Sequence, residues 1–193
     1  MLSPFSFRFN SGRLSLDLAA TVRRRPSAPN DLLLARGTAV RWLKEARVIQ
    51  RLLSLSTQQE GKLRQLREAI YASASSLAEG LSLPVMDVET INRIAAYPVP
   101  VLRLDPSTME LEWSAEDPFA AALSLIARDA LDLIAGPQAP LIRACAQEDC
   151  GMIFVDTSTG MRRRWCSMDR CGSRAKGTAF RRKHTENAHD HVG

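Results

Sequence analysis

Hydrophobic residues between positions 57 and 81 recur at intervals of three and four residues, which predicts a long amphipathic helix. Leu63, Leu66 and Ile70 fall on one face of that helix. The run Thr57-Gln-Gln-Glu60 resembles a capping box and indicates where the helix begins. A shorter amphipathic helix is expected to begin at Thr38.

Two further helices and a hairpin are predicted after this segment. One helix is expected over residues 86–96. A strongly apolar one is expected over residues 118–134, because Asp117 suits an N-cap and Pro118 suits the first helical position. Between them, residues 99–104 and 109–113 alternate between apolar and polar side chains around a Pro-Ser turn, which is typical of a β-hairpin.

The first residues alternate as well. Phe5, Phe7 and Phe9 are separated by polar side chains and precede a turn at Asn10-Ser-Gly12, so we expect a short strand there. The stretch after that turn, to Val22, is interpreted as a strand end that runs into a helix. Its one carboxylate, Asp17, is interpreted as a helix cap or a local hydrogen-bond acceptor in preference to a ligand-binding group.

Composition narrows the class of protein. Hydrophobic residues make up 45% of the 193 residues, which is enough for a packed core. No apolar run approaches the roughly 20 residues that span a bilayer, and the N-terminus does not resemble a signal peptide. We therefore expect a cytoplasmic protein that does not enter the membrane. Its thiols stay reduced there, which favours a metal site over disulfides.

The positive charge is concentrated near the C-terminus. Residues 160–183 contain nine basic residues and one acid, Asp169, whereas residues 1–140 are close to neutral. A near-neutral body with one basic end is the pattern expected when a single module binds a polyanion such as nucleic acid.

All four cysteines of the chain lie in this region, as two C-x4-C pairs: Cys145 with Cys150, and Cys166 with Cys171. Two short Cys loops joined by a spacer supply the four thiolates that tetrahedral zinc prefers. In the spacer, Ile153-Phe-Val155 and Arg163-Arg-Trp165 flank a turn-forming run, which predicts a hairpin between the pairs. We expect one structural zinc ion.

The residues after the second pair favour a helix with two different faces. Met168, Cys171 and Ala175 fall on one side of a helical wheel, and Arg170, Arg174 and Arg181 cluster on another. Cys166 is about 140° from Cys171 on that wheel, so it must precede the regular helix if both bind one ion. Knuckle, hairpin and helix together form a treble-clef-like plan.

The pattern as a whole predicts an α+β fold with two domains. Residues 1–138 would form a mostly helical N-terminal domain with a small antiparallel sheet, and residues 139–193 would form the zinc finger. The boundary is set by Gly136-Pro-Gln-Ala-Pro140, which ends the apolar helix. No His occurs before position 184, so the body offers no His-based catalytic scheme, and we expect no enzyme.

Two motifs resemble a known family. Trp165-Cys-Ser-Met168 and Cys171-Gly-Ser-Arg174, followed by Phe180-Arg-Arg182, are similar to the zinc finger named for its Cys-Gly-Asn-Arg (CGNR) motif. Gly12-Arg-Leu-Ser-Leu-Asp-Leu-Ala-Ala-Thr21 is similar to the Gly-x-Leu-x-Leu-Asp-Phe-Ala-Asn-Thr opening of the ABATE domain, which precedes that finger. Ser173 stands where the finger motif has Asn, and it lacks the amide that reads adenine.

The resemblance implies a bacterial transcription regulator in which all four cysteines bind zinc and the finger binds DNA. It also implies that the ABATE domain senses a small-molecule effector. Two alternatives to DNA binding stay open: a zinc-stapled protein-interaction module and an RNA-binding protein. A homodimer would enlarge the small footprint of one finger. The residues expected to contact nucleic acid are Arg162, Arg163, Arg164, Arg170, Ser173, Arg174, Lys176, Arg181, Arg182 and Lys183.

Overall fold

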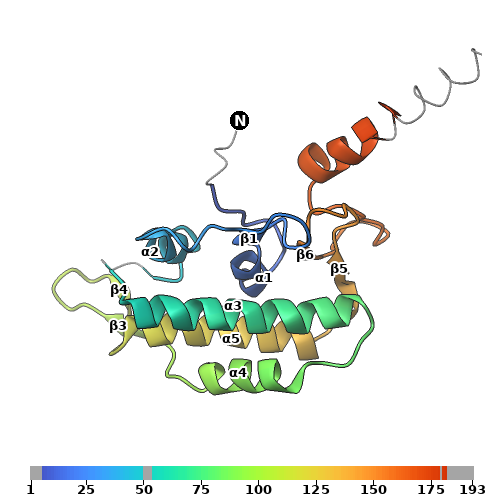
Figure 1. Cartoon of the computed structure of the whole chain (residues 1–193). Coiled ribbons are helices and arrows are strands. Elements are labelled where there is room, and N and C mark those ends of the chain that lie inside the picture. The colour runs from blue at the N-terminus through green and yellow to red at the C-terminus, as the bar shows by residue number, and fades with distance from the viewer. Residues whose placement is uncertain (1–5, 50–53, 179, 182–193) are drawn as a thin grey trace, which may run out of the picture.

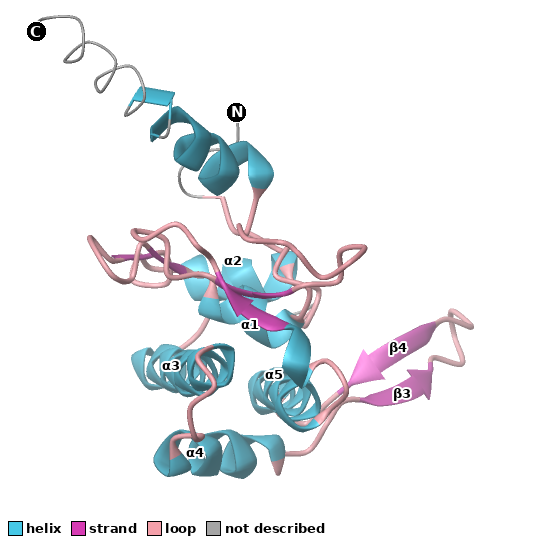
Figure 2. Cartoon of the chain, turned by 90° about the vertical axis from the view of Figure 1, so that its right-hand side faces the viewer, coloured by secondary structure: helices cyan, strands magenta, loops and turns pink. Residues whose placement is uncertain are grey.

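Three helices form the body of the molecule. The computed structural model describes residues 6–49, 54–178 and 180–181. The three helices pack on one another, and their axes form a triangle when viewed end-on (Figure 2). They are α3 (Thr57–Ala78), α4 (Val85–Ala95) and α5 (Pro118–Ala135). All three were expected from the sequence at nearly these positions.

The starts of α3 and α5 follow from local capping. The Asp117 side chain accepts hydrogen bonds from the backbone N–H groups of Phe119 and Ala120, both at 3.0 Å, so the predicted N-cap is confirmed. In α3 the capping box is one residue earlier than predicted. Ser56 Oγ accepts from Gln59 N at 3.2 Å, and Gln59 Oε1 accepts from Ser56 N at 2.9 Å. Serine at the N-cap satisfies the first free N–H groups of the helix.

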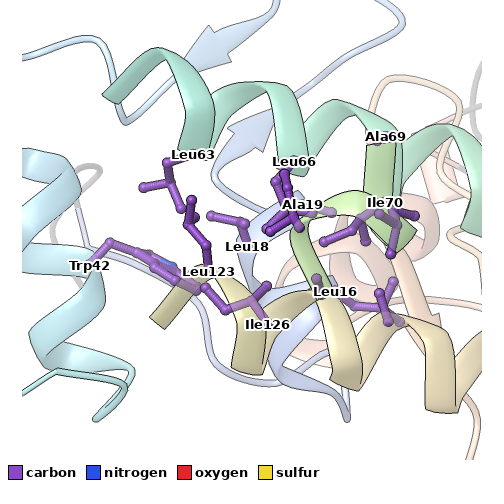
Figure 3. Packing of buried hydrophobic residues seen from close by; sticks show 14 of the residues in the cluster. Leu16, Leu18, Ala19, Trp42, Leu63, Leu66, Ala69, Ile70, Leu123 and Ile126 are labelled. Atoms are coloured by element: carbon purple, nitrogen blue, oxygen red, sulfur yellow. The ribbon is translucent and has the colours of Figure 1, made fainter. Parts of the chain in front are cut away.

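Two shorter helices cover the side of the α3–α5 pair that faces away from α4. Helix α1 (Leu14–Ala19) contacts both α3 and α5, and α2 (Thr38–Glu45) lies farther out (Figure 1). Figure 3 shows the core between these helices, where Leu16 and Leu18 of α1 and Trp42 of α2 are fully buried. Hydrophobic burial of this kind is the main force that holds the helices together.

The first residues differ from the sequence-based prediction. Residues 6–10 form no strand, and Phe7 is buried whereas Phe9 is largely exposed; Phe5 lies outside the described residues. The order after the turn is also reversed, because α1 precedes the short strand β1 (Val22–Arg23), which pairs with β2 (Asn30–Asp31). Packing of Leu16 and Leu18 against the body outweighs the local alternation.

The predicted hairpin in the body is confirmed. Strands β3 (Val101–Leu104) and β4 (Leu111–Ser114) pair antiparallel, with Arg103 opposite Glu112. The hairpin projects sideways from the helices (Figure 2). Trp113 and most of its other apolar side chains are exposed.

The prediction of a hairpin between the two cysteine pairs is wrong. Strand β6 (Ile153–Val155) pairs with β5 (Ile142–Ala144), which follows the short helix η1 (Ala139–Leu141), and not with residues 163–165. The segment after β6 turns instead around Asp156, whose carboxylate accepts from Ser158 N at 3.0 Å and from Arg163 N at 2.8 Å. These bonds hold the segment in a loop that cannot pair as a strand.

Strand β6 is buried on both of its faces. Ile153 and Val155 belong to the same hydrophobic core as the helices of the body, whereas Phe154 belongs to a second, small core with three of the cysteines. Because successive side chains of a strand point to opposite faces, β6 packs into both cores and connects them. The predicted boundary between residues 138 and 139 precedes a strand pair that packs on α3 and α1.

Candidate zinc centre and nucleic-acid interface

The first cysteine pair lies in the turn between β5 and β6. The strands bring the ends of this turn together, since Ala144 pairs with Ile153 and Cys145 N donates to Met152 O at 2.9 Å. Inside the turn, Cys150 N donates to Gln147 O at 2.9 Å. Gly151 then adopts a left-handed conformation, with φ of 65°, as a sharp turn back into a strand requires. The short hairpin thus forms a knuckle that points two thiols the same way.

The second pair lies at the start of the C-terminal helix. Cys166 precedes the helix and Cys171 lies within its first, wide turn, η2 (Met168–Gly172), after which residues 173–178 continue as an α-helix. Cys171 N and Gly172 N both donate to Ser167 O, at 3.1 and 3.0 Å. The prediction that Cys166 lies before the regular helix is confirmed.

The four sulfur atoms meet in one cluster. All four Sγ atoms lie within 4.8 Å of one another, and three of the distances are 3.7 Å (Cys150 to Cys166), 3.5 Å (Cys166 to Cys171) and 3.6 Å (Cys171 to Cys150). These distances are far longer than a disulfide bond of about 2.0 Å. They are close to the roughly 3.8 Å between corners of a tetrahedron whose zinc–sulfur bonds are about 2.3 Å.

The protonation states of the cysteines depend on one another. Hydrogen bonds from Cys150 and Cys166 lower the pKa of Cys145. The hydrogen bond to Cys145 in turn raises the pKa of Cys150 to about 12 and raises that of Cys166 as well. One thiolate is thus stabilised by hydrogen bonds from neighbouring thiols, which keep their protons, and repulsion between buried negative charges adds to this effect. Four soft donors at tetrahedral spacing fit one structural zinc ion, and zinc would keep all four thiols deprotonated.

Arg174 holds two parts of this centre together. Its Nη2 donates to Cys171 Sγ at 3.5 Å, and its Nη1 donates to Asp149 Oδ2 at 2.8 Å, in the knuckle. The hydrogen bond to Cys171 is the largest cause of the raised pKa of Arg174. Bonds of this kind to a ligand sulfur orient the ligand and stabilise its charge.

Arg163 also points into the finger. Its guanidinium lies over the Phe154 ring, with its central carbon 4.4 Å from the ring centroid. Its Nε donates to Trp165 O at 3.0 Å, and its Nη2 donates to Cys166 O. Arg163 therefore braces the loop before the second cysteine pair and has few donors left for a partner molecule.

The other predicted contact residues differ in exposure. Arg162, Arg164, Ser173, Lys176 and Arg181 are exposed, and Arg170 is half-buried. The Ser173 hydroxyl donates to Met168 O at 3.1 Å, so it bonds to the backbone of its own helix. Arg164 lies over the half-buried Trp165 ring, 5.1 Å from its centroid. Arg182 and Lys183 lie outside the described residues.

Comparison with known families assigns both parts of the chain. Residues 12–137 match the model of the ABATE family, whose description is "Putative stress-induced transcription regulator". The chain belongs to the ABATE family. Residues 142–184 match the CGNR zinc finger, as the two sequence motifs predicted. No curated protein matches the chain. Among the residues that the structure describes, no helix of this ABATE protein is long and apolar enough to cross a membrane.

The opening motif of the ABATE domain makes a buried junction with the finger. Val155 N in β6 donates to Ser11 O at 2.8 Å, and Gly12, with φ of 93°, lies against the Val155 side chain. Asp17 Oδ1 accepts from Ser11 N at 3.0 Å and from Ser11 Oγ at 2.6 Å, which confirms its predicted role as a local acceptor. Burial raises the pKa of Asp17 to about 6, although the Ser11 bonds oppose the shift.

Sequence reasoning missed several residues around the zinc centre. Asp149 and Asp156 each fix the finger by hydrogen bonds, but a lone carboxylate in a loop carries no sequence signal for that role. Arg8 precedes the opening motif of the ABATE domain and Arg23 follows it, and both lie beside the C-terminal helix. Their place depends on contacts between residues more than 100 positions apart, which no local pattern reveals.

Proposed function

We propose that this ABATE protein is a transcription regulator that binds DNA through its zinc finger. The observation that carries the proposal is the position of the C-terminal helix. The helix begins at the cysteine cluster and projects away from the body (Figure 1), with exposed basic side chains along it. A helix held at one end by zinc and otherwise exposed is suited to enter the major groove.

The charge of the finger supports a polyanionic partner. Arg162, Arg164 and Lys176 are exposed and form no ion pair within the part of the chain that the structure describes. Such side chains are available for phosphate contacts, which supply most of the affinity for nucleic acid. Arg163 and Arg174 bond within the finger itself, so among the residues expected to contact nucleic acid they are weaker candidates than Arg162, Arg164 and Lys176.

The state of Trp165 argues against single-stranded RNA stacking at the basic loop. Trp165 is the aromatic side chain beside the basic loop, and it is half-buried against the cysteine cluster with Arg164 over its ring. Recognition of single strands relies on exposed aromatic faces that stack on bases.

The zinc ion is proposed to be structural, and the protein is proposed not to be an enzyme. Four cysteine ligands fill a tetrahedral coordination sphere, whereas catalytic zinc keeps one position open for water or substrate. The metal would instead fix the start of the helix relative to the knuckle.

Fluorescence anisotropy with a generic duplex across a salt series tests DNA binding. For the zinc-loaded chain, log K should fall steeply with log salt, by about 0.9 for each phosphate contacted. The double variant Arg162→Ala, Lys176→Ala should bind more weakly and reduce the slope by about 1.8. The double variant Lys62→Ala, Arg93→Ala removes the same charge from the helical body and should leave the slope unchanged.

The alternative function is a protein-interaction module in which zinc only stabilises the fold. It predicts no DNA binding at low salt by a chain that contains one zinc ion. Equal losses in both double variants would mean that only net charge matters, and they would contradict a specific interface on the finger.

A further inference from the structure

A pocket lies where the opening of the ABATE domain meets the finger. It has a volume of about 820 Å³, which is within the range of small-molecule sites. One wall comes from residues 8–30 and the other from residues 147–181. The pocket therefore belongs to neither part alone.

Arginines dominate the lining of this junction pocket. Six of them contribute, from both walls, and Asp169 is the only carboxylate among the lining residues. Arg24 and Arg174 both face Asp149, at 3.6 and 2.8 Å. The other four are Arg8, Arg23, Arg170 and Arg181.

Two of these arginines have buried donors without an acceptor. The Nε atoms of Arg8 and Arg170 are inaccessible to solvent and form no hydrogen bond with the described residues. A buried donor that lacks a partner costs roughly 1–3 kcal/mol, and more when it carries charge. Native proteins rarely leave such groups unsatisfied without a reason.

The guanidinium groups also repel one another. Burial and then the charge of Arg170 lower the pKa of Arg8. Burial and then the charges of Arg8 and Arg170 lower the pKa of Arg23 to about 10. Zinc bound by four thiolates carries a formal charge of −2 and offsets part of this repulsion, but its sulfur atoms do not satisfy the two buried Nε donors.

We propose that the junction pocket binds a small molecule through a phosphate group. A phosphate dianion presents several oxygens, which match guanidinium forks that approach from two sides. The Thr178 hydroxyl lies in the same lining and adds a further donor. Val22 and Met152 offer apolar surface for the organic part of the ligand.

The site also explains how a ligand would act on the finger. Arg8 and Arg23 belong to the body, whereas Arg170 belongs to the first turn of the C-terminal helix. A phosphate held between them would fix the direction of that helix relative to the body. This regulatory consequence rests on the proposed function, but phosphate binding itself does not require DNA.

Inorganic phosphate is the probe for the test. Isothermal titration calorimetry and thermal unfolding of the zinc-loaded full chain are compared in phosphate and in chloride at equal ionic strength. We expect saturable phosphate binding and a melting temperature raised by a few degrees. Arg8→Gln should weaken binding at least tenfold. Arg170→Lys keeps the charge but removes the fork, and it should weaken binding similarly.

Controls separate a binding role from a structural one. Arg93→Gln removes an exposed charge on α4 and should leave phosphate affinity unchanged. Zinc content is measured for every variant. Loss of zinc in Arg8→Gln, together with no phosphate binding by the wild type, would mean that the arginines only neutralise the thiolates and would overturn the proposal.

A second arm separates a small ligand from the DNA backbone. If the wild type binds duplex DNA but not free phosphate, and Arg8→Gln weakens DNA binding, the arginines contact the duplex and the small-molecule site is wrong. If phosphate binds and Arg8→Gln abolishes it while DNA binding is absent in all variants, the pocket stands and the proposed function fails.

Discussion

Arg174 was expected to contact nucleic acid, but its hydrogen bonds lie within the zinc centre. It bonds to the sulfur of Cys171 and to the Asp149 carboxylate, and so links the helix to the knuckle. Partial burial disfavours the charge of Asp149, but the bond from Arg174 and its positive charge lower the pKa of that carboxyl. The last residue of the CGNR motif therefore acts in part as a brace for the zinc site.

Arg174→Ala is expected to weaken zinc binding by about 10- to 100-fold, because it removes a hydrogen bond to a ligand. Competition with a chromophoric chelator measures this affinity. Lys176→Ala, on the same helix but without a bond to the cysteines, is the matched control. Unchanged zinc affinity together with loss of DNA binding would instead make Arg174 a DNA contact.

Asp17 gives the stability of the protein a specific dependence on pH. Its folded pKa of about 6 lies above the ordinary value, mainly because of burial, so the folded state binds a proton more tightly than the unfolded state. Its contribution to stability is present below about pH 4 and is lost as pH rises towards 6.

Asp17→Asn should therefore gain stability relative to the wild type as pH rises. Between pH 5 and 7.5 the gain is expected to be about 1 kcal/mol. Urea denaturation of both proteins at each pH measures it, and effects of pH on the zinc site cancel in the difference. A constant difference across this range would show that Asp17 titrates at an ordinary pKa.

At the scale of elements, local signals predicted the helices well and the strands less well. Helix α5 begins where Asp117 and Pro118 indicate, because capping depends on neighbouring residues alone. The predicted pairing of β6 was wrong, because a three-residue strand has too few alternating positions to specify its partner. The zinc ligands were predictable, since cysteine spacing reflects coordination chemistry, whereas the junction pocket depends on contacts between the two ends of the chain.

Gly12 is a position at the scale of elements where a single added methyl group should matter. Its φ of 93° disfavours any side chain, and an added Cβ would lie 3.3 Å from Val155 Cβ. Gly12→Ala should therefore destabilise the chain by about 1 kcal/mol or more. Gly61→Ala, in α3 with open space around it, should instead stabilise the chain by up to about 1 kcal/mol. Chemical denaturation distinguishes the two, and equal effects would contradict the close contact with β6.

At the scale of the whole molecule, the two cores should unfold together. Ile142, Ile153 and Val155 complete the core of the helical body, and the turn between their strands carries two zinc ligands. Removal of zinc with a chelator is expected to lower the melting temperature of the entire chain by at least about 10 °C. Circular dichroism of the helices reports this change. If the chelator leaves the melting temperature of the helices unchanged, the body folds independently of the finger.

The β3–β4 hairpin is the surface that best fits the predicted homodimer. Leu102, Leu104, Leu111 and Trp113 share one face and are each at least half exposed, and within the described residues the two strands pair only with each other. Isolated two-stranded sheets are rarely stable, and a second copy could cover the same face and edge. Light scattering should give a dimer for the wild type and a monomer for Leu102→Asp, with helix content unchanged. A monomeric wild type would exclude this interface.

The sharing of β6 between the two cores bears on how such proteins can be recombined. Gene fusions that exchange fingers among relatives would naturally be joined in the Gly136–Pro140 linker, where the helix ends. Such a joint separates β6 from the Ser11 and Gly12 backbone on which Val155 packs. In such a fusion, β6 of the transferred finger would pack against an N-terminal domain whose side chains differ from those of its own. The finger and the opening motif therefore form one structural unit, although most of the chain separates them in sequence.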